Sequence, residues 1–207
     1  VEVVRRGIDA WATKRTISGV DVLHARSIRR CEGGAAELRA ALKGDSFRCA
    51  SRRGKYLWLP LAGAKDQALV VHLGMSGQVL MQPPSEAEET HLRVRVCFAD
   101  DDREMRFVDQ RTFGGMHVDE VIDGVPSSIT HIARDPLDPD FDDAATVLAI
   151  RHKDSEVKRV LLDQSVVSGI GNIYADESLF VAGVQPLTPA ETLSLEQLKH
   201  LLSLIHI

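Results

Sequence analysis

The sequence predicts an α+β protein, in which a β-rich N-terminal domain is followed by an α-helical domain. Three observations support this prediction. Between Asp45 and Gly115, apolar and polar residues mostly alternate, which is typical of half-buried strands. A stretch rich in aspartate and proline, residues 134–140, then interrupts all periodicity. Beyond it, apolar residues recur at three- and four-residue spacing, as they do in amphipathic helices.

Several segments of strand length make up the β-rich half. Residues 91–98 alternate almost without a break, the aspartates at 100–102 turn the chain, and residues 105–107 resume the apolar face, so we expect a hairpin there. The apolar runs 56–59 and 68–71 predict further strands. Short strands separated by turns indicate an antiparallel sandwich or barrel.

Helical spacing occurs at two places in the β-rich half. Apolar residues spaced by three or four positions from Val1 to Trp11 predict an amphipathic helix that starts without a cap. Residues 35–43 predict a second helix, which Gly44 stops.

Four short helices are expected in the second half of the chain. The signals, in chain order, are a cap at 142 or 143 before residues 147–150, apolar spacing over 157–161, a segment 173–182 that stops at Gly183, and capping boxes at 188–191 and 194–197.

We divide the chain accordingly into a β domain, 1–133, a linker, 134–141, and a helical domain, 142–201. The last residues, 202–207, abandon the polar periodicity of the preceding helix. They back-translate into the end of a transposon adapter used for sequencing libraries, and we expect them to be an assembly artefact. Sequencing the gene beyond Leu201 tests this expectation.

The composition describes a soluble globular chain without bulk positive charge. Its 207 residues include 25 Lys and Arg and 30 Asp and Glu, a formal net charge of −5. Binding of a polyanion through bulk charge is therefore excluded, and nucleic acid would require a local basic face. A hydrophobic share of 44% excludes wholesale disorder. Because no apolar run spans a bilayer and no leader is present, we expect a cytoplasmic protein without membrane contact.

Cysteine usage predicts no structural metal in this chain. Cys31, Cys49 and Cys97 lie far apart and form no C-x-x-C pair. We interpret them as small buried apolar residues in a reducing compartment.

Two basic segments are candidate anion contacts. Residues 151–159 are rich in cations and precede the turn 168–172, where two glycines and a helix start, with Asn172 as its cap, favour a phosphate. A plain interhelical turn is the alternative. Lys55, at the entry to a strand, is either a solvated sheet edge or an ammonium group that pairs with phosphate or transfers a proton.

Two glycine-rich loops, 72–77 and 109–115, follow predicted strands. Met75 and Phe113 are core residues in the simplest interpretation, but a glycine-rich loop leaves both free to point outward. With Arg111 beside Phe113, the loops would then present apolar wedges and a cation, the groups that extrude a base from duplex DNA and fill its place.

Taken together, these segments resemble the bacterial formamidopyrimidine-DNA glycosylase family. The resemblance covers essentially Val1 to Leu201. The motifs, in chain order, are Val1–Gly7, Arg53–Leu57, His72–Gly77, Arg111–Gly114 and Gly169–Leu179. The last one resembles the helix–two-turn–helix signature of the family.

The resemblance implies a fold and an activity. The fold is an N-terminal antiparallel β-sandwich with flanking helices, then the helix–two-turn–helix domain, and in the longer protein a finger with one zinc ion; no cofactor is expected in this chain. The activity is that of a monomeric base-excision repair enzyme of the bacterial cytoplasm and nucleoid. It removes oxidised purines (8-oxoguanine and formamidopyrimidines) from double-stranded DNA and cuts the abasic strand by β/δ-elimination.

Roles for single residues follow from the resemblance alone. Lys55 matches the proton donor of the β-elimination. The void left by the flipped nucleotide is filled by the residues that match Met75, Arg111 and Phe113. Further DNA contacts match His91, Arg111 and Lys153, and phosphate-binding positions match His72, Lys158 and Asn172.

The chain departs from the family pattern at two places. The family reads Asp-Pro-Arg-Arg-Phe-Gly where this chain has residues 109–114, and an Asn-Lys pair where it has Gln164 and Ser165. We expect altered affinity rather than altered chemistry.

The family nucleophile is the secondary amine of an N-terminal proline, which a glutamate follows. A terminal amine titrates at about 7.7–8.0 and is partly uncharged at neutral pH, whereas an internal proline nitrogen is an unreactive amide. In the family, the terminal amine of this proline attacks C1′ of the flipped nucleotide and forms a Schiff base. Because this polypeptide begins with Val1, we expect that it does not excise a base and that it binds DNA weakly, through phosphates.

Three other functions stay open. An endonuclease VIII-like glycosylase would prefer oxidised pyrimidines, but Met75 with Arg111 and Phe113 favours the purine enzyme. A non-catalytic module that binds damaged DNA is the second. The codons upstream of Val1 discriminate it from the enzyme, because a Met-Pro-Glu start supports the enzyme and any other start supports the binding module. A generic phosphate-binding protein is the third.

Overall fold

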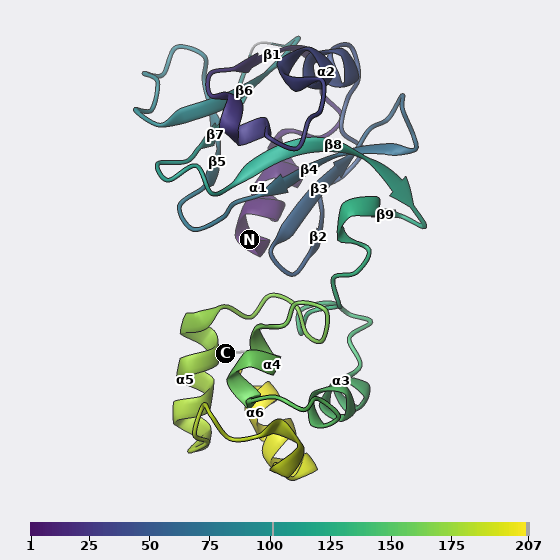
Figure 1. Ribbon diagram of the computed structural model, residues 1–207. Helices are drawn as coiled ribbons and strands as arrows, with labels where there is room; N and C mark the ends of the chain where they lie inside the picture. Colours follow the sequence, from purple (N-terminus) through teal and green to yellow (C-terminus); the bar gives the residue numbers. More distant parts are fainter. Residues whose placement is uncertain (101, 206–207) are drawn as a thin grey trace. The chain divides into compact units, whose positions relative to one another are not determined.

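The structure, a computed structural model, describes residues 1–100 and 102–205 (Figure 1). The chain divides into two compact units, Val1–Thr130 and the part from His131 onward. Each unit has its own cluster of buried apolar residues. An α+β chain with a β-rich first half and a helical second half was predicted, and this is confirmed.

Two antiparallel sheets form the first unit. The smaller sheet has the order β1 (Ile17–Val22), β6 (Leu92–Phe98), β7 (Glu104–Val108), β5 (Gln78–Gln82). The larger has the order β2 (Ser51–Arg53), β3 (Tyr56–Pro60), β4 (Gln67–His72), β8 (Gly115–Ile122), β9 (Val125–Pro126). Apolar residues of both sheets, including Val71 and Phe107, join one buried cluster. The unit is therefore a sandwich with its core between the sheets.

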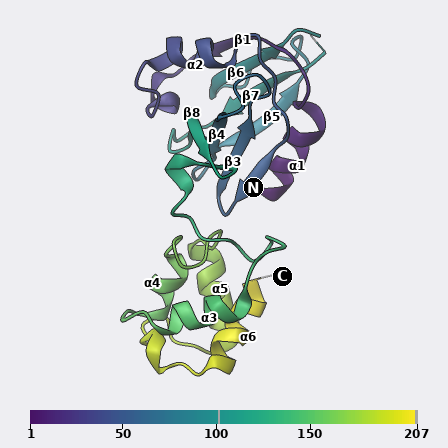
Figure 2. The same ribbon diagram turned by 90° about the vertical axis from the view of Figure 1, so that its right-hand side faces the viewer.

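Two helices close the open sides of this sandwich (Figure 2). Helix α1 (Glu2–Trp11) contacts β5 and β2, the edge strands of one side, and buries Ile8 in the core. Helix α2 (Gly34–Leu42) contacts β1 and β8 on the other side and buries Leu38 and Leu42. Short 3₁₀ helices, η1 (Ala25–Ile28) and η2 (Ser127–Ile129), complete the unit.

The predicted hairpin is confirmed, because β6 and β7 pair along their length, with Val96 opposite Met105. Part of its predicted turn, Asp101, lies outside the described residues. The expectation that Trp11 belongs to the buried face of the first helix is wrong. Trp11 is exposed at the end of α1, where the Arg103 guanidinium lies 4.5 Å from its ring centroid in a cation–π contact.

The second unit is helical. It contains α3 (Asp143–Arg151), α4 (Val157–Leu162), α5 (Asn172–Ala182), η3 (Ala190–Thr192) and α6 (Leu195–Ile205). The Asp142 side chain caps α3 by accepting from the Ala145 N–H at 2.9 Å, and Gly183, at φ +66°, ends α5 in the left-handed region.

Of the two predicted capping boxes, only the second forms. Ser194 Oγ accepts from the Gln197 N–H at 3.1 Å, and Gln197 Oε1 accepts from the Ser194 N–H at 2.9 Å. The box predicted at residues 188–191 is wrong. There the Thr188 carbonyl accepts from the Val157 N–H at 2.8 Å, so the segment is bound to the start of α4 instead of opening an α-helix.

The predicted linker, 134–141, has fixed contacts inside the second unit. Arg134 pairs with Asp138 at 2.8 Å, and its carbonyl accepts from the Ser168 N–H at 3.3 Å. The two units separate earlier, between Thr130 and His131.

Helix α6 continues past Leu201. Leu198, Leu201 and Leu202 are all buried, at spacings of three and four positions, so Leu202 lies on the buried face of the same helix although the polar periodicity ends there. The remaining residues of the predicted artefact, 206–207, lie outside the described residues.

Candidate nucleic-acid interface

The candidate residues of the first unit gather at one end of the sandwich. Tyr56, which follows Lys55, pairs with His72, and His72 pairs with Gly115. On the other sheet, Leu92 and Gln78 both pair with Val108. His72 ends β4, and the loops that leave these strand ends carry the other candidates, Lys55, Met75, His91, Arg111 and Phe113. Sequence positions up to sixty residues apart are thereby brought to one edge by strand register.

Two of these loops, β4–β5 and β7–β8, cross from one sheet to the other and touch backbone to backbone. Gly74 has φ +62°, and a Cβ atom there would lie 2.5 Å from the Gly114 nitrogen. A Cβ atom on Gly114 would lie 2.6 Å from the His72 carbonyl oxygen. Only glycine permits this approach, which is the physical reason for the glycines of both loops.

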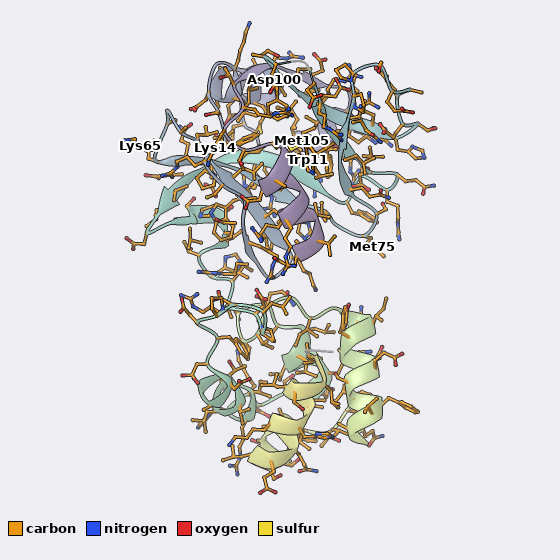
Figure 3. The ribbon with its side chains drawn as sticks, turned by 180° about the vertical axis from the view of Figure 1, so that it is seen from behind. Trp11, Lys14, Lys65, Met75, Asp100 and Met105 are labelled. Carbon is orange, nitrogen blue, oxygen red and sulfur yellow. The ribbon has the colours of Figure 1, made fainter. Side chains whose placement is uncertain are left out.

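The tips of the two loops point outward. Met75 is 71% exposed and lies at the edge of the unit, away from the sheets (Figure 3), and Phe113 is 43% exposed. The Arg111 guanidinium lies 4.9 Å from the Phe113 ring centroid, a cation–π contact. The interpretation of Met75 and Phe113 as core residues is therefore excluded.

A cationic neighbourhood surrounds His72 at the same end. Burial lowers the pKa of His72, and nearby cations, which include Arg30 and Lys55, lower it further. The His72 ring packs against the Tyr56 ring with centroids 4.7 Å apart. Lys55 lies in the turn between β2 and β3, half-buried, and burial lowers its pKa. Such a site attracts an anion and favours proton transfer nearer neutral pH.

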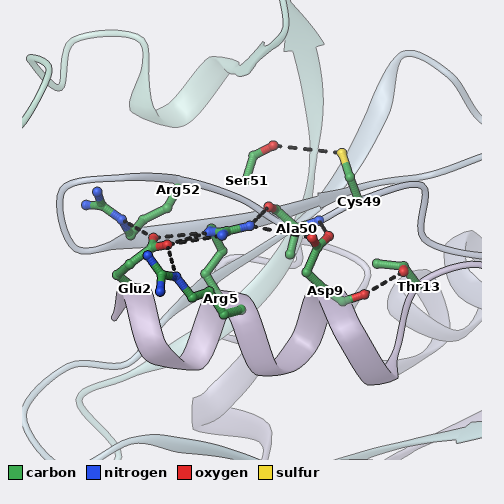
Figure 4. Close-up of polar contacts among 9 residues, drawn as sticks. Glu2, Arg5, Asp9, Thr13, Cys49, Ala50, Ser51 and Arg52 are labelled. Atoms are coloured by element: carbon green, nitrogen blue, oxygen red, sulfur yellow. Dashed lines mark hydrogen bonds and ion pairs between the residues drawn. The ribbon is translucent and has the colours of Figure 1, made fainter. Parts of the chain in front are cut away.

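The start of α1 lies beside the strand that precedes Lys55 (Figure 4). Glu2 accepts hydrogen bonds from Arg5 and from Arg52 of β2, each at 3.0 Å. Arg5 also donates to the Ala50 carbonyl at 3.0 Å. This network fixes the first helical turn against the β2–β3 hairpin.

The candidates of the helical unit lie around α4 and α5. Lys158 on α4 pairs with Asp176 on α5 at 2.6 Å, and Lys153 pairs with Asp163 at 3.3 Å. The prediction that Asn172 caps α5 is wrong. Gly171, at φ −115° and ψ 176°, is the N-cap, and Asn172 is already the first helical residue, with its side chain exposed.

Both units match descriptions of known domains. Residues 1–116 match the formamidopyrimidine-DNA glycosylase N-terminal domain, and residues 132–206 match the formamidopyrimidine-DNA glycosylase H2TH domain. The chain belongs to the formamidopyrimidine-DNA glycosylase family.

Curated members of this family are similar over most of the chain. A formamidopyrimidine-DNA glycosylase of Streptomyces avermitilis is 57% identical over 186 residues, which are 89% of this chain and 65% of the relative. A formamidopyrimidine-DNA glycosylase of Salinispora tropica is 53% identical over 194 residues, which are 94% of this chain and 67% of the relative. The chain thus spans about two thirds of the length of these relatives.

Solved structures agree with the fold over nearly the whole chain. A complex between Lactococcus lactis Fpg and DNA with an abasic site has a TM-score of 0.83 at 26% identity, covering 99% of this chain and 74% of that chain. A complex of Lactococcus lactis Fpg with DNA that contains FAPY-dG has a TM-score of 0.83 at 26% identity. The match covers 99% of this chain and 75% of that chain.

One departure from the family pattern has a structural role in this chain. Gln164 Oε1 accepts from the Gly169 N–H, and its Nε2 donates to the carbonyls of Leu162 and Ile170, each at 3.0 Å. Gly169 has φ +89°. Gln164, which stands where the family pattern has an asparagine, therefore holds the glycine turn that leads into α5.

Cysteines and acidic residues offer no metal site in the described part of the chain, where no group of three or more His, Cys, Asp or Glu side chains could hold an ion. The expectation of buried cysteines is correct for Cys31 only, since Cys49 is exposed and Cys97 is half-exposed.

Among the described residues, no helix combines the length and apolar character needed to cross a membrane.

Sequence reasoning missed Asp109 and Arg29. Asp109 is fully buried, and its carboxylate accepts from groups of both glycine-rich loops, whereas Arg29 donates to the carbonyls of Phe113 and Gly114. Two signals for Asp109 were available in the sequence: it directly follows a predicted strand in a loop with two glycines, and the family pattern that residues 109–114 resemble begins with an aspartate.

Proposed function

We propose that this protein is a base-excision repair glycosylase and abasic-site lyase for oxidised purines in double-stranded DNA. The observation that carries the proposal is the backbone contact between two loops that exposes Met75, Arg111 and Phe113 together, at the same end of the sandwich as Lys55 and His72. Family membership and the DNA-bound solved relatives support it.

The exposed loop tips fit the task of replacing an extruded nucleotide. Apolar side chains that enter the base stack compensate for lost stacking, and a cation beside them meets the acceptors of the unpaired base. We assign the apolar parts to Met75 and Phe113 and the cation to Arg111. His91, half-buried just before β6, would contact the DNA beside them.

Lys55 is assigned proton transfer during β-elimination. A lysine whose pKa is lowered by burial exchanges a proton at neutral pH more readily than an exposed lysine. His72 lies next to it in a cationic neighbourhood and is assigned to a DNA phosphate.

The helical unit is assigned to the phosphate backbone. Asn172 and the N–H groups at the start of α5 favour an anion, because a helix N-terminus carries partial positive charge, and Lys158 is held near α5 by Asp176. Lys153 would add a further cation. These contacts would supply affinity without sequence preference.

A zinc ion, which the resemblance implies for the longer protein, is assigned no ligand among the described residues and no step of the reaction. The Schiff base is assigned to the terminal amine of a proline, which Val1 is not.

Borohydride trapping on an 8-oxoguanine duplex tests the function. A protein expressed from the gene with its codons upstream of Val1 should become covalently trapped, whereas the 207-residue polypeptide should bind DNA weakly and not be trapped. Its affinity should fall steeply with salt because phosphate contacts release counterions. Robust trapping of the 207-residue polypeptide would show that the nucleophile is misassigned.

The alternative is an endonuclease VIII-like glycosylase, favoured only by membership of the same superfamily. A panel of duplexes with 8-oxoguanine, formamidopyrimidine and oxidised pyrimidines separates the two, and a preference for pyrimidines would contradict the assignment of Met75, Arg111 and Phe113.

A further inference from the structure

One buried carboxylate connects the two loops. Asp109 has no exposed surface. Its Oδ1 accepts from Ser76 Oγ at 2.6 Å and from the Arg111 N–H at 3.2 Å, and its Oδ2 accepts from the Gly114 N–H at 2.8 Å. Ser76 adjoins Met75, and Gly114 adjoins Phe113. Arg111 therefore donates to Asp109 itself, whereas Met75 and Phe113 each adjoin a residue that donates to Asp109.

The main chain of Asp109 extends the connection to His91. Its N–H donates to the His91 carbonyl at 3.0 Å, and its carbonyl accepts from Arg93 Nε at 2.8 Å. The Arg93 Nη2 lies 3.4 Å from the His91 ring nitrogen Nδ1. The start of β6 is thus tied to the same residue as both loop tips.

From this geometry we propose that Asp109 is a positioning residue, which holds Met75, Arg111 and Phe113 in the mutual arrangement that enters the DNA. The inference rests on the proposed function. Because Asp109 is buried, it acts through the N–H and O–H groups of the loops that donate to it. A loop tip displaced by an ångström would no longer fit the space left by a base.

A second side chain, that of Arg29, binds the backbone of the same loop. Arg29, which follows η1, donates to the Gly114 carbonyl at 2.9 Å and to the Phe113 carbonyl at 3.0 Å. Between these anchors Thr112 has φ +52°, a conformation that side-chain-bearing residues avoid unless the surroundings impose it. The loop therefore does not relax freely into this shape; Asp109 and Arg29 impose it.

Electrostatics explain why an aspartate suits this position. Burial alone would raise the pKa of Asp109, but the hydrogen bonds from Ser76 and from the loop N–H groups outweigh it, and the pKa is lowered. The carboxylate is therefore ionised at neutral pH and accepts from every donor. An asparagine has one acceptor oxygen and would turn an NH₂ group toward a donor.

Ser76→Ala tests the inference, with Ser127→Ala as its matched control. Both changes remove one serine hydroxyl that donates to an aspartate at 2.6 Å within the first unit, but Ser127 donates to Asp119, away from the loop tips. A role confined to stability predicts similar consequences for both variants. A positioning role predicts that only Ser76→Ala changes how the loops engage DNA.

The first measurement needs no DNA. The amide of Gly114, which donates to Asp109 Oδ2, is the reporter, because the Arg111 N–H also donates to Ser76 Oγ itself at 3.2 Å. Its hydrogen exchange should become about tenfold faster in Ser76→Ala, as the carboxylate loses the hydrogen bond that orients it, and stay unchanged in Ser127→Ala. Ser76→Thr, which keeps the hydroxyl, should restore slow exchange. Unchanged exchange in Ser76→Ala would overturn the inference.

The second measurement uses a duplex with 2-aminopurine opposite an abasic site, whose fluorescence rises when the base is unstacked. With DNA saturated, the unsubstituted chain and Ser127→Ala should raise the fluorescence equally, whereas Ser76→Ala and Asp109→Asn should lose most of the rise at unchanged salt dependence of binding. A full rise with Ser76→Ala overturns the inference. No rise with the unsubstituted chain refutes the proposed insertion of the loop tips instead.

Discussion

At the scale of the residue, Glu2 shows how a single carboxylate organises a helix start. It accepts from Arg5 and Arg6 of its own helix and from Arg52 of β2. The hydrogen bond from Arg5 is the largest influence and lowers the pKa of Glu2 from 4.5 to about 2, although burial opposes it. The ionised form is thus favoured by folding.

Stability should therefore depend on pH through Glu2. A carboxyl group with a lowered pKa in the folded state stabilises fully above its unfolded pKa of 4.5, and the contribution is lost as pH falls toward 2. The Glu2→Gln variant should have a lower Tm than the parent at neutral pH, and the difference should shrink across this window. Thermal unfolding followed by circular dichroism measures it.

Glu120→Gln, which alters an exposed carboxylate of β8, is the control and should keep a constant difference from the parent. Parallel curves for Glu2→Gln and the parent would contradict the stabilising role of the Glu2 network.

At the scale of the element, the start of α6 depends on a reciprocal capping box, which satisfies two N–H groups that the helix leaves unpaired. Ser194→Ala should destabilise the helical unit by about 1 kcal/mol. Urea unfolding monitored by circular dichroism measures this change.

Thr188→Ala provides the matched control, because no α-helix begins there and the Thr188 contribution is its backbone carbonyl. Its effect should stay within about 0.5 kcal/mol. Equal effects of the two substitutions would show that the geometry of the box adds nothing to stability.

The elements also show what local sequence predicts and what it does not. Hairpin β6–β7 and the cap of α3 follow from periodicity and from one aspartate, because each depends on neighbours in the chain. Two equally good capping boxes precede α6, but only one forms. The backbone of the other is used by α4, a contact between residues about thirty positions apart that no local pattern reveals.

At the scale of the whole molecule, two separate apolar clusters stabilise the two units. Leu198→Ala removes a fully buried side chain of the second cluster and should cost about 2–5 kcal/mol there. Both tryptophans of the chain, Trp11 and Trp58, lie in the first unit. In Leu198→Ala, the part of the circular dichroism signal that comes from the helical unit should therefore disappear at a lower urea concentration than in the parent. The midpoint of the tryptophan fluorescence transition should stay unchanged.

Leu38→Ala, in the first cluster, should have the reverse effect on the two signals. A shift of the fluorescence transition by the same amount in Leu198→Ala would contradict independent cores.

The sequence by itself determined the α+β class, the α-helices, the strands β3, β4, β6 and β7, and the glycine-rich loops, since these depend on side-chain periodicity and on conformations that few residues tolerate. The remaining strands, β1, β2, β5, β8 and β9, were not predicted. Tertiary structure decided which loops meet. Met75 and Phe113 are exposed on two touching loops because strand register and the close approach of Gly74 to Gly114 bring these loops together, and Asp109 binds both loops from inside. A buried carboxylate is stable only where distant donors converge on it, and that convergence exists only in the folded chain.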